Sequence, residues 1–238
     1  MDANSECSDL RSRVAVVIPC YNAGARLRPV AARMAELVEH VIVVDDGSTD
    51  DGVTALTDDR VQVVRLDVNQ GKGKALLEGF RAALKITGIE CVCTCDADGQ
   101  HAPDELINLY RAFVQSSADL VIGSRTFGER HVPLRSRLGN NLTIFITALL
   151  LGQRLPDTQS GYRLHSRRLV EEVLRSVPGG RYETEMEVII RAARRGFRIV
   201  PAPISTIYET RNRSSHFHKV RDSFRIYRKL LTAVFYRR

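Results

Sequence analysis

Two aspartates separated by one residue, Asp96 and Asp98, are the side chains of this sequence best suited to chemistry. They end an apolar run that begins at Cys91, and Gly99 stops that run, so we expect both at the carboxyl end of a buried strand. Ligands bind at that edge of open α/β sheets. Adjacent carboxylates repel each other, and Mg²⁺ or Mn²⁺ held by their oxygens would also bind a substrate phosphate.

The pair therefore predicts a site for a divalent metal and a diphosphate, with Gln100 as a further metal ligand or hydrogen-bond partner. The alternative interpretation is a polar turn in which Asp96 caps the following helix, because short motifs also recur without function. The rest of the chain has to decide between the two interpretations.

The segments around this pair alternate between strand and helix. Buried strands are expected at residues 13–19, 41–46, 61–66 and 120–124, in addition to the run that ends at Asp96. Helices are expected at residues 26–39, after the glycine- and lysine-rich segment 69–74, and at residues 103–115. Short connections between alternating strands and helices predict an α/β fold, with a mostly parallel sheet, helices on both faces and right-handed crossovers.

After Arg125 the pattern changes. A basic loop (127–137), a strongly apolar helix (142–155), a turn and short strand (157–164), helices at 166–176 and 183–195, and an edge strand (197–207) are expected. Residues 219–238 predict a helix with one apolar and one basic face, which either docks on the core or lies on a membrane surface. We divide the chain into a flexible N-terminus (1–12), one catalytic domain (13–215) and this C-terminal helix (216–238).

Composition limits the class of protein and its partners. The 238 residues are 44% hydrophobic and 26% charged, which is ordinary for a soluble globular protein. A membrane-spanning helix needs ~20 apolar residues, which no segment approaches, and the polar first residues do not resemble a signal peptide. We therefore expect a cytoplasmic protein, peripheral on the inner face of the cell membrane. The net charge of +7 favours an anionic partner.

Three of the five cysteines, Cys91, Cys93 and Cys95, alternate along one strand and should share one face. Their spacing does not fit a zinc or iron–sulfur site, so we interpret them as reduced core thiols. Nucleic acid is not expected as a partner, because the basic residues are not interleaved with aromatic residues in a recognition motif.

Six motifs occur in the order VVIPCYN, VVDDGSTD, NQGKGKAL, DADGQH, GSR and DTQSGYRL. In this order and spacing they resemble family 2 glycosyltransferases, and in particular the polyprenol-phosphate sugar synthases typified by dolichyl-phosphate mannose synthases. The resemblance implies an A-type glycosyltransferase fold, a nucleotide-sugar donor, a divalent metal and inversion at the anomeric carbon. Ala23 replaces a glutamate that lies beside the nucleotide in relatives, so the nucleoside stays open between UDP and GDP.

The resemblance also assigns the donor site. It implies that Pro19, Tyr21 and Asn22 shape the base pocket and that Asp45 or Asp46 binds ribose or base. The donor-binding residues that it implies are Pro19, Tyr21, Asn22, Asp45, Asp46, Gly47, Lys72, Asp96, Ala97 and Asp98. Lys72 and Lys74 would close on the diphosphate, or alternatively would be solvated lysines at a helix start.

On the acceptor side, Arg125, Ser136, Arg137 and Arg213 fall in the segments that hold the acceptor phosphate in similar synthases. Paired hydrogen bonds from guanidinium groups suit a phosphate. A phosphate nucleophile is already ionised and needs no strong base, whereas a sugar hydroxyl would need a carboxylate such as Glu185 or Glu187.

We thus expect an inverting, metal-dependent transferase that moves a sugar to a polyprenyl phosphate, with Asp98, Glu185 and Arg125 as its catalytic residues. One alternative is transfer to a hydroxyl of a saccharide or small molecule. A further alternative is a non-catalytic nucleotide-sugar-binding protein.

Overall fold

The structure is a computed structural model and describes residues 3–125, 148 and 155–205. The strands are β1 (Val14–Cys20), β2 (His40–Asp45), β3 (Val61–Arg65), β4 (Cys91–Thr94), β5 (Leu120–Arg125), β6 (Arg163–Ser166) and β7 (Ile199–Ile204). The helices are α1 (Ala3–Arg13), α2 (Leu27–Leu37), α3 (Lys72–Leu84), α4 (Leu106–Ser116), α6 (Arg167–Ser176) and α7 (Glu183–Arg194). Short 3-10 turns, η1 (Gly24–Arg26) and η2 (Pro103–Glu105), precede α2 and α4.

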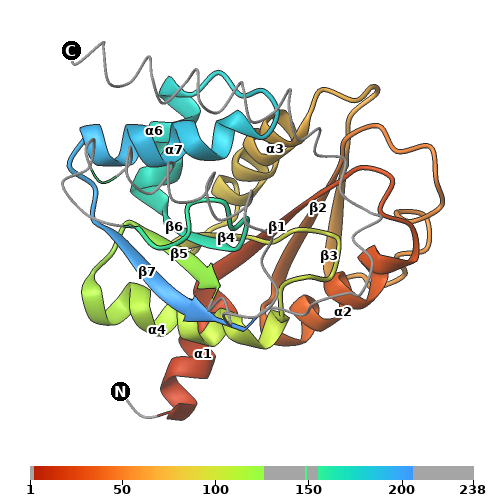
Figure 1. The fold of residues 1–238 in the computed structure, drawn as a ribbon. Coiled ribbons are helices and arrows are strands. Elements are labelled where there is room, and N and C mark those ends of the chain that lie inside the picture. Colours follow the sequence, from red (N-terminus) through yellow and green to blue (C-terminus); the bar gives the residue numbers. More distant parts are fainter. Residues whose placement is uncertain (1–2, 126–147, 149–154, 206–238) are drawn as a thin grey trace, which may run out of the picture.

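These strands form one sheet in the order β3-β2-β1-β4-β6-β5-β7 (Figure 1). The pairs β1–β2, β1–β4, β2–β3 and β5–β7 are parallel, as the alternating pattern predicts. Strand β6 is antiparallel to both β4 and β5 and separates them. The mixed α/β class and the mostly parallel sheet are confirmed, and β7 lies at the edge of this sheet as predicted.

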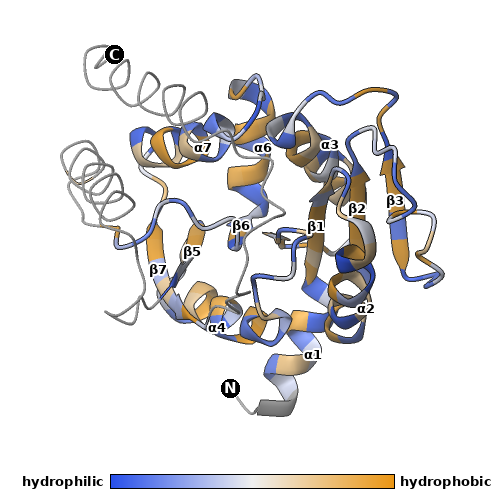
Figure 2. Ribbon diagram, turned by 45° about the vertical axis from the view of Figure 1, so that its right-hand side comes forward, coloured by the Kyte–Doolittle hydropathy of each residue, from blue (hydrophilic) through white to orange (hydrophobic). Residues whose placement is uncertain are grey.

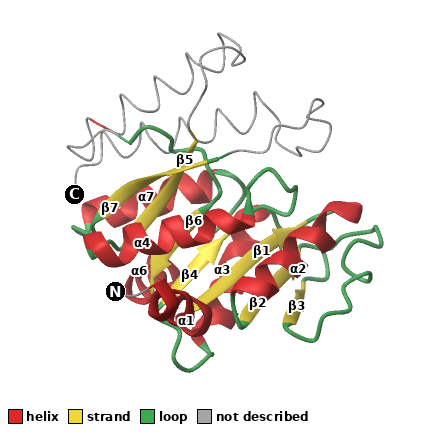
Figure 3. Ribbon diagram, turned by 90° about the horizontal axis from the view of Figure 1, so that it is seen from below, coloured by secondary structure: helices red, strands yellow, loops and turns green. Residues whose placement is uncertain are grey.

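The sheet is covered on both faces. Helices α3, α6 and α7 lie on one side of the sheet, and α1, α2 and α4 lie on the other (Figure 1), which is the side turned toward the viewer in Figure 3. Strands β1 and β2 are strongly hydrophobic between α3 and α2 (Figure 2), because a strand covered on both faces buries every side chain. Cys91, Cys93 and Cys95 all pack in the α2–α4 layer, and Val92 packs in the opposite one. The predicted single face of buried thiols is therefore confirmed.

The N-terminal segment differs from the prediction. We expected residues 1–12 to be flexible, but Ala3–Arg13 form helix α1. Leu10 is buried, and Glu6 of this helix accepts a hydrogen bond of 2.9 Å from Arg111 of α4. The segment is polar and gives a weak helical pattern, so its order comes from contacts with α4 that local periodicity does not reveal.

In the described residues no helix is both long and apolar enough to cross a membrane. The predicted basic loop (127–137) and C-terminal helix (219–238) lie outside those residues, as does nearly all of the apolar helix at 142–155.

Candidate active site

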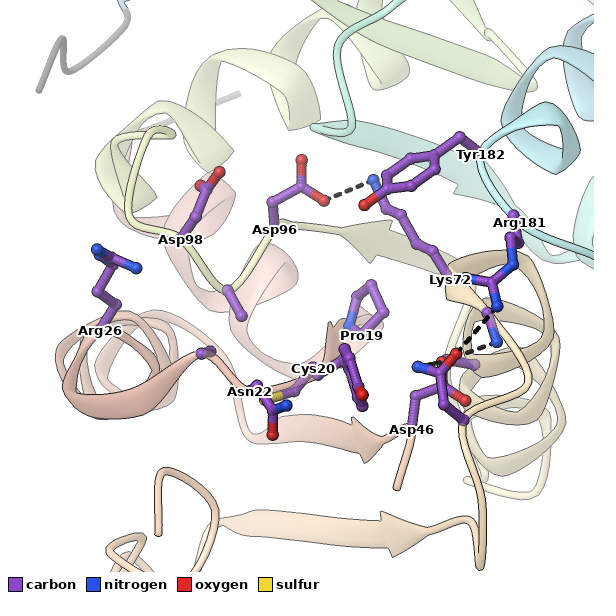
Figure 4. A pocket seen from close by; sticks show the side chains of 16 residues that line it. Pro19, Cys20, Asn22, Arg26, Asp46, Lys72, Asp96, Asp98, Arg181 and Tyr182 are labelled. Atoms are coloured by element: carbon purple, nitrogen blue, oxygen red, sulfur yellow. Dashed lines mark hydrogen bonds and ion pairs between the residues drawn. The ribbon is translucent and has the colours of Figure 1, made fainter. Parts of the chain in front are cut away.

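A cleft of about 360 Å³ opens at the carboxyl ends of β1 and β4. Its walls come from residues 19–23 at the end of β1 and just beyond it, 96–98 after β4, the start of α3, and residues 181–182 before α7 (Figure 4). The sheet edge predicted from the aspartate pair is therefore the edge that carries the cleft.

The structure brings most of the predicted donor-site residues together. Those that line the cleft are Pro19, Tyr21, Asn22, Asp46, Lys72, Asp96, Ala97 and Asp98. Five other predicted residues fall outside the residues that line it, namely Asp45, Gly47, Gln100, Arg125 and Glu185. Ser136, Arg137 and Arg213 lie outside the described residues.

The two aspartates that end β2 have different roles. Asp46 accepts hydrogen bonds from the Asn69 side chain (2.9 Å) and from the backbone N–H groups of Gln70 (2.7 Å) and Gly71 (2.8 Å). Asp46 therefore anchors the loop that leads into α3, and burial raises its pKa above the ordinary value. Asp45 accepts a hydrogen bond from Ser48 N (2.8 Å) and so stabilises the turn after β2.

Asn22 joins the loops that follow β1 and β2. Its backbone has a φ of 49°, its side-chain oxygen accepts a hydrogen bond from Thr49 N (2.8 Å), and its own N–H donates to Ser48 Oγ (3.0 Å). Gly47 has a φ of 73°, and a Cβ there would lie 2.8 Å from Asn69 N. Glycine meets both conditions, so Gly47 allows the turn after β2 to pack against residues 68–69.

Lys72 forms the charged centre of the cleft. Its Nζ lies 2.6 Å from Asp96 Oδ1 and 3.0 Å from Glu185 Oε2, and its ammonium stands 5.9 Å from the centre of the Tyr182 ring. Burial by itself lowers the pKa of Lys72, but the charges of Asp96 and Glu185 outweigh it and raise that pKa. Burial raises the pKa of Asp96, and Lys72 together with His101 more than reverses this, so the carboxylate stays ionised. The solvated-lysine alternative is thus wrong for Lys72.

Two further residues of this region, which the sequence did not assign to the site, hold Asp96. His101 Nε2 lies 3.5 Å from Asp96 Oδ2, and the buried His101 ring stacks on Tyr162 with 5.2 Å between ring centres. Gly161 faces the carboxylate, and a Cβ at this position would lie 2.5 Å from Asp96 Oδ2. Lys72, His101 and Gly161 therefore hold the Asp96 carboxylate in one position, which a solvated turn residue would not require.

Asp98 lines the cleft beside Asp96, and its Oδ1 accepts a hydrogen bond from Gln100 N (3.0 Å). Burial and then the negative charge of Asp96 raise the pKa of Asp98. A divalent cation would relieve that repulsion, and two carboxylates with substrate phosphates and water make a donor set that suits Mg²⁺ or Mn²⁺. In the described part of the chain no three His, Cys, Asp or Glu side chains converge as a metal cluster. The chain thus fits such a cation when a phosphate ligand completes the set.

Glycines bring the starts of α3 and α7 close together. A Cβ on Gly73 would lie 2.0 Å from Thr184 Oγ1, and one on Gly71 would lie 2.7 Å from the Arg181 side chain. Lys74 N also donates to Gly180 O (3.1 Å). As a result Arg181 and Tyr182 line the cleft, although the sequence interpretation missed both. The available signal was a glycine pair followed by an aromatic residue directly before an acidic helix start.

Arg125 pairs with a buried carboxylate. Its Nε and Nη2 donate to Asp157 at 2.6 and 3.1 Å. Arg163, from the same DTQSGYRL motif as Asp157, is also buried and donates to the carbonyl oxygens of Ser160 (2.8 Å), Glu185 (2.7 Å) and Thr158 (2.9 Å). Through Asp157 and Arg163, this motif therefore links the end of β5 to the start of α7.

Comparison with known proteins places these features in a family. The model of glycosyl transferase family 2 matches residues 15–174. A UDP-N-acetylglucosamine–dolichyl-phosphate N-acetylglucosaminyltransferase of Methanococcus voltae is 30% identical over 91% of this chain and 94% of that protein. A polyprenol monophosphomannose synthase of Mycolicibacterium smegmatis is 35% identical over 81% and 77% of the two chains.

A solved structure confirms the fold. Glucosyl-3-phosphoglycerate synthase from Mycobacterium tuberculosis, in complex with UDP, superposes with a TM-score of 0.73 at 23% identity, over 98% of this chain and 84% of that one. The A-type glycosyltransferase architecture predicted from the sequence is therefore present.

Proposed function

The chain belongs to glycosyl transferase family 2, and on that basis we propose that it transfers a sugar from a nucleoside-diphosphate sugar to a polyprenyl phosphate, with inversion at the anomeric carbon. The observation that carries the proposal is the cleft in which Lys72, Asp96 and Asp98 meet at the sheet edge. Relatives named for transfer to dolichyl phosphate and undecaprenyl phosphate, each about as long as this chain, support the lipid acceptor.

In the proposed complex the nucleoside occupies the part of the cleft between Pro19, Asn22 and Asp46, with Asp46 near the ribose. The diphosphate lies beside Lys72, Asp96 and Asp98. Mg²⁺ or Mn²⁺ bound by the two aspartates would supply the charge that neutralises the leaving diphosphate. UDP is the first nucleotide to test, because the Methanococcus voltae relative is named for a UDP-sugar donor.

The acceptor phosphate attacks the anomeric carbon as an oxyanion, so no side chain has to remove a proton. The position of Glu185 agrees with this chemistry, because its carboxylate contacts the Lys72 ammonium and does not line the cleft. Ser136, Arg137 and Arg213 remain our predicted phosphate ligands with Arg125, and residues 216–238 our predicted contact with the membrane surface.

The test is transfer from a panel of UDP- and GDP-sugars to a polyprenyl phosphate, with Mg²⁺ or Mn²⁺, for the wild type and Asp98→Asn. We expect transfer by the wild type, loss of transfer and of metal-dependent nucleotide binding in the variant, and an unchanged melting temperature, because Asp98 is only partly buried at the cleft. Full activity of the variant, or activity that a chelator does not reduce, would reject the metal-dependent site. A saccharide acceptor is assayed in parallel, and transfer to its hydroxyl but not to the lipid would reject polyprenyl phosphate as the acceptor.

A further inference from the structure

Glu185 lies behind Lys72 as seen from the cleft. Lys72 and Asp96 line the cleft, whereas Glu185 lines a small internal cavity with Phe80 and Leu76. The Glu185 side chain is 13% exposed, and its Oε2 lies 3.0 Å from Lys72 Nζ. The ammonium therefore stands between Glu185 and any ligand in the cleft.

The backbone of Glu185 is held in place from two directions. Arg163, which is fully enclosed by protein, donates from Nη1 to the Glu185 carbonyl oxygen at 2.7 Å. Gly73 of α3 packs so closely on Thr184 that a Cβ would meet Thr184 Oγ1 at 2.0 Å. The backbone that carries the Glu185 side chain is consequently held in place, and that side chain is largely enclosed, whereas Lys72 has a long flexible stem.

A lysine ammonium has three N–H donors. Asp96 Oδ1 and Glu185 Oε2 take two of them, at 2.6 and 3.0 Å. Within the described part of the chain, these two carboxylate oxygens are the oxygen partners of Lys72 Nζ. Because the ammonium is tetrahedral, two bound N–H groups also set the direction of the third. Since Lys72 lines the cleft, that third donor is available to a phosphate oxygen of a bound ligand.

We propose that Glu185 is a positioning residue that acts through Lys72, holding the ammonium beside Asp96 so that one N–H is presented to the diphosphate of the donor. This inference rests on the proposed function of the cleft as a nucleotide-sugar site. It gives Glu185 a role in donor binding and none in removing a proton from the acceptor.

The experiment is a double-mutant cycle on nucleotide affinity. Calorimetry gives the Kd of UDP or GDP, whichever the wild type binds, with Mn²⁺, for the wild type, Glu185→Gln, Lys72→Met and the double variant. We expect Glu185→Gln to weaken binding about tenfold, within the range of couplings measured between residues in contact. In the Lys72→Met background the same change should have little effect. The matched control is Glu171→Gln, because Glu171 forms an exposed pair with Arg167 on the surface of α6.

Steady-state kinetics separate the proposed role from a catalytic one. Glu185→Gln should raise KM for the donor more than it lowers kcat, and its melting temperature identifies any loss of fold. If Glu185→Gln is unstable, Glu185→Asp, which keeps the charge but withdraws the carboxylate from Lys72 Nζ, takes its place in the cycle. An equal loss of affinity in both backgrounds, or a fall in kcat at unchanged nucleotide affinity, would overturn it. Failure of the wild type to bind either nucleotide would instead reject the proposed function.

Discussion

Replacing Gly161 by alanine should damage nucleotide binding although Gly161 lies outside the residues that line the cleft. The added Cβ would lie 2.5 Å from Asp96 Oδ2 and 2.9 Å from Asp96 Oδ1, where ordinary contacts are 3.4–4 Å. The carboxylate must therefore move by roughly 1 Å to restore van der Waals contact. It has little freedom to do so, because Lys72 holds Oδ1 at 2.6 Å and His101 lies 3.5 Å from Oδ2.

The size of the effect follows from the ion pair between Lys72 and Asp96, which a displaced Asp96 carboxylate would break. Loss of a hydrogen bond to a charged partner costs about 1.5–3 kcal/mol, or roughly a tenfold to hundredfold change in affinity. The Kd of UDP with Mn²⁺, measured by calorimetry, should rise by that factor in Gly161→Ala. Gly88→Ala is the control, because Gly88 has a φ of 86° and, its two chain neighbours aside, no heavy atom of a described residue lies within 4 Å of the position that a Cβ would take. It should lose about 1 kcal/mol of stability from backbone strain and keep its nucleotide affinity.

Wild-type affinity of Gly161→Ala for UDP and Mn²⁺ would refute this reasoning, since it would mean that Asp96 does not need its position against Gly161. Loss of affinity in Gly88→Ala as well would show that the assay reports general destabilisation. The melting temperatures of both variants decide between specific and general damage.

Two further predictions concern buried charge. Arg125→Ala leaves the Asp157 carboxylate buried without its guanidinium and should lower the free energy of unfolding by about 2–3 kcal/mol, which Arg125→Ala with Asp157→Asn should partly restore in chemical denaturation. Unchanged stability of the single variant would contradict the pairing. Burial lowers the pKa of His165 from 6.5 to about 3, so the unfolded chain binds one more proton below pH 6.5 and stability is lost as the pH falls, by about 2 kcal/mol at pH 5. In His165→Asn the difference in unfolding free energy between pH 7.5 and pH 5 should be smaller by that amount, and an equal pH dependence in both proteins would contradict a buried neutral His165.

The elements that local pattern encodes could be predicted from the sequence. Strands β1, β2, β4 and β5 are short apolar runs, and each was placed within one or two residues of its bounds. The helix expected at residues 166–176 is α6, and the Ser166 hydroxyl caps it by accepting from Leu169 N at 3.2 Å. Asp96 and Asp98 reach the cleft because a parallel strand that ends in polar residues has one place for them, the carboxyl edge.

The features that depend on distant parts of the chain could not be predicted from the residues alone. The antiparallel insertion of β6 depends on its pairing with β4, about 70 residues away in the chain, and with β5, about 40 residues away, which periodicity does not encode. From the sequence, a charged residue such as Arg163 would be expected to face solvent, yet it is buried and donates to three carbonyl oxygens. The pairing of Arg125 with the buried Asp157 was equally hidden.

The insertion of β6 explains why two halves of the chain build one site. Because β6 lies next to β4, Gly161 packs against Asp96. The chain that continues from β6 through α6 then brings Glu185 to Lys72. The family match ends at residue 174, so Arg181 and Tyr182 line the cleft, and Glu185 contacts Lys72, from beyond the matched residues. The part of the cleft built by the matched residues holds the paired aspartates, which under the proposed function bind the metal whatever the donor sugar. We therefore expect exchanges of residues 179–187 with those of a relative that uses another donor to change donor preference while metal dependence is retained. Loss of metal dependence in such an exchange would contradict this division of roles.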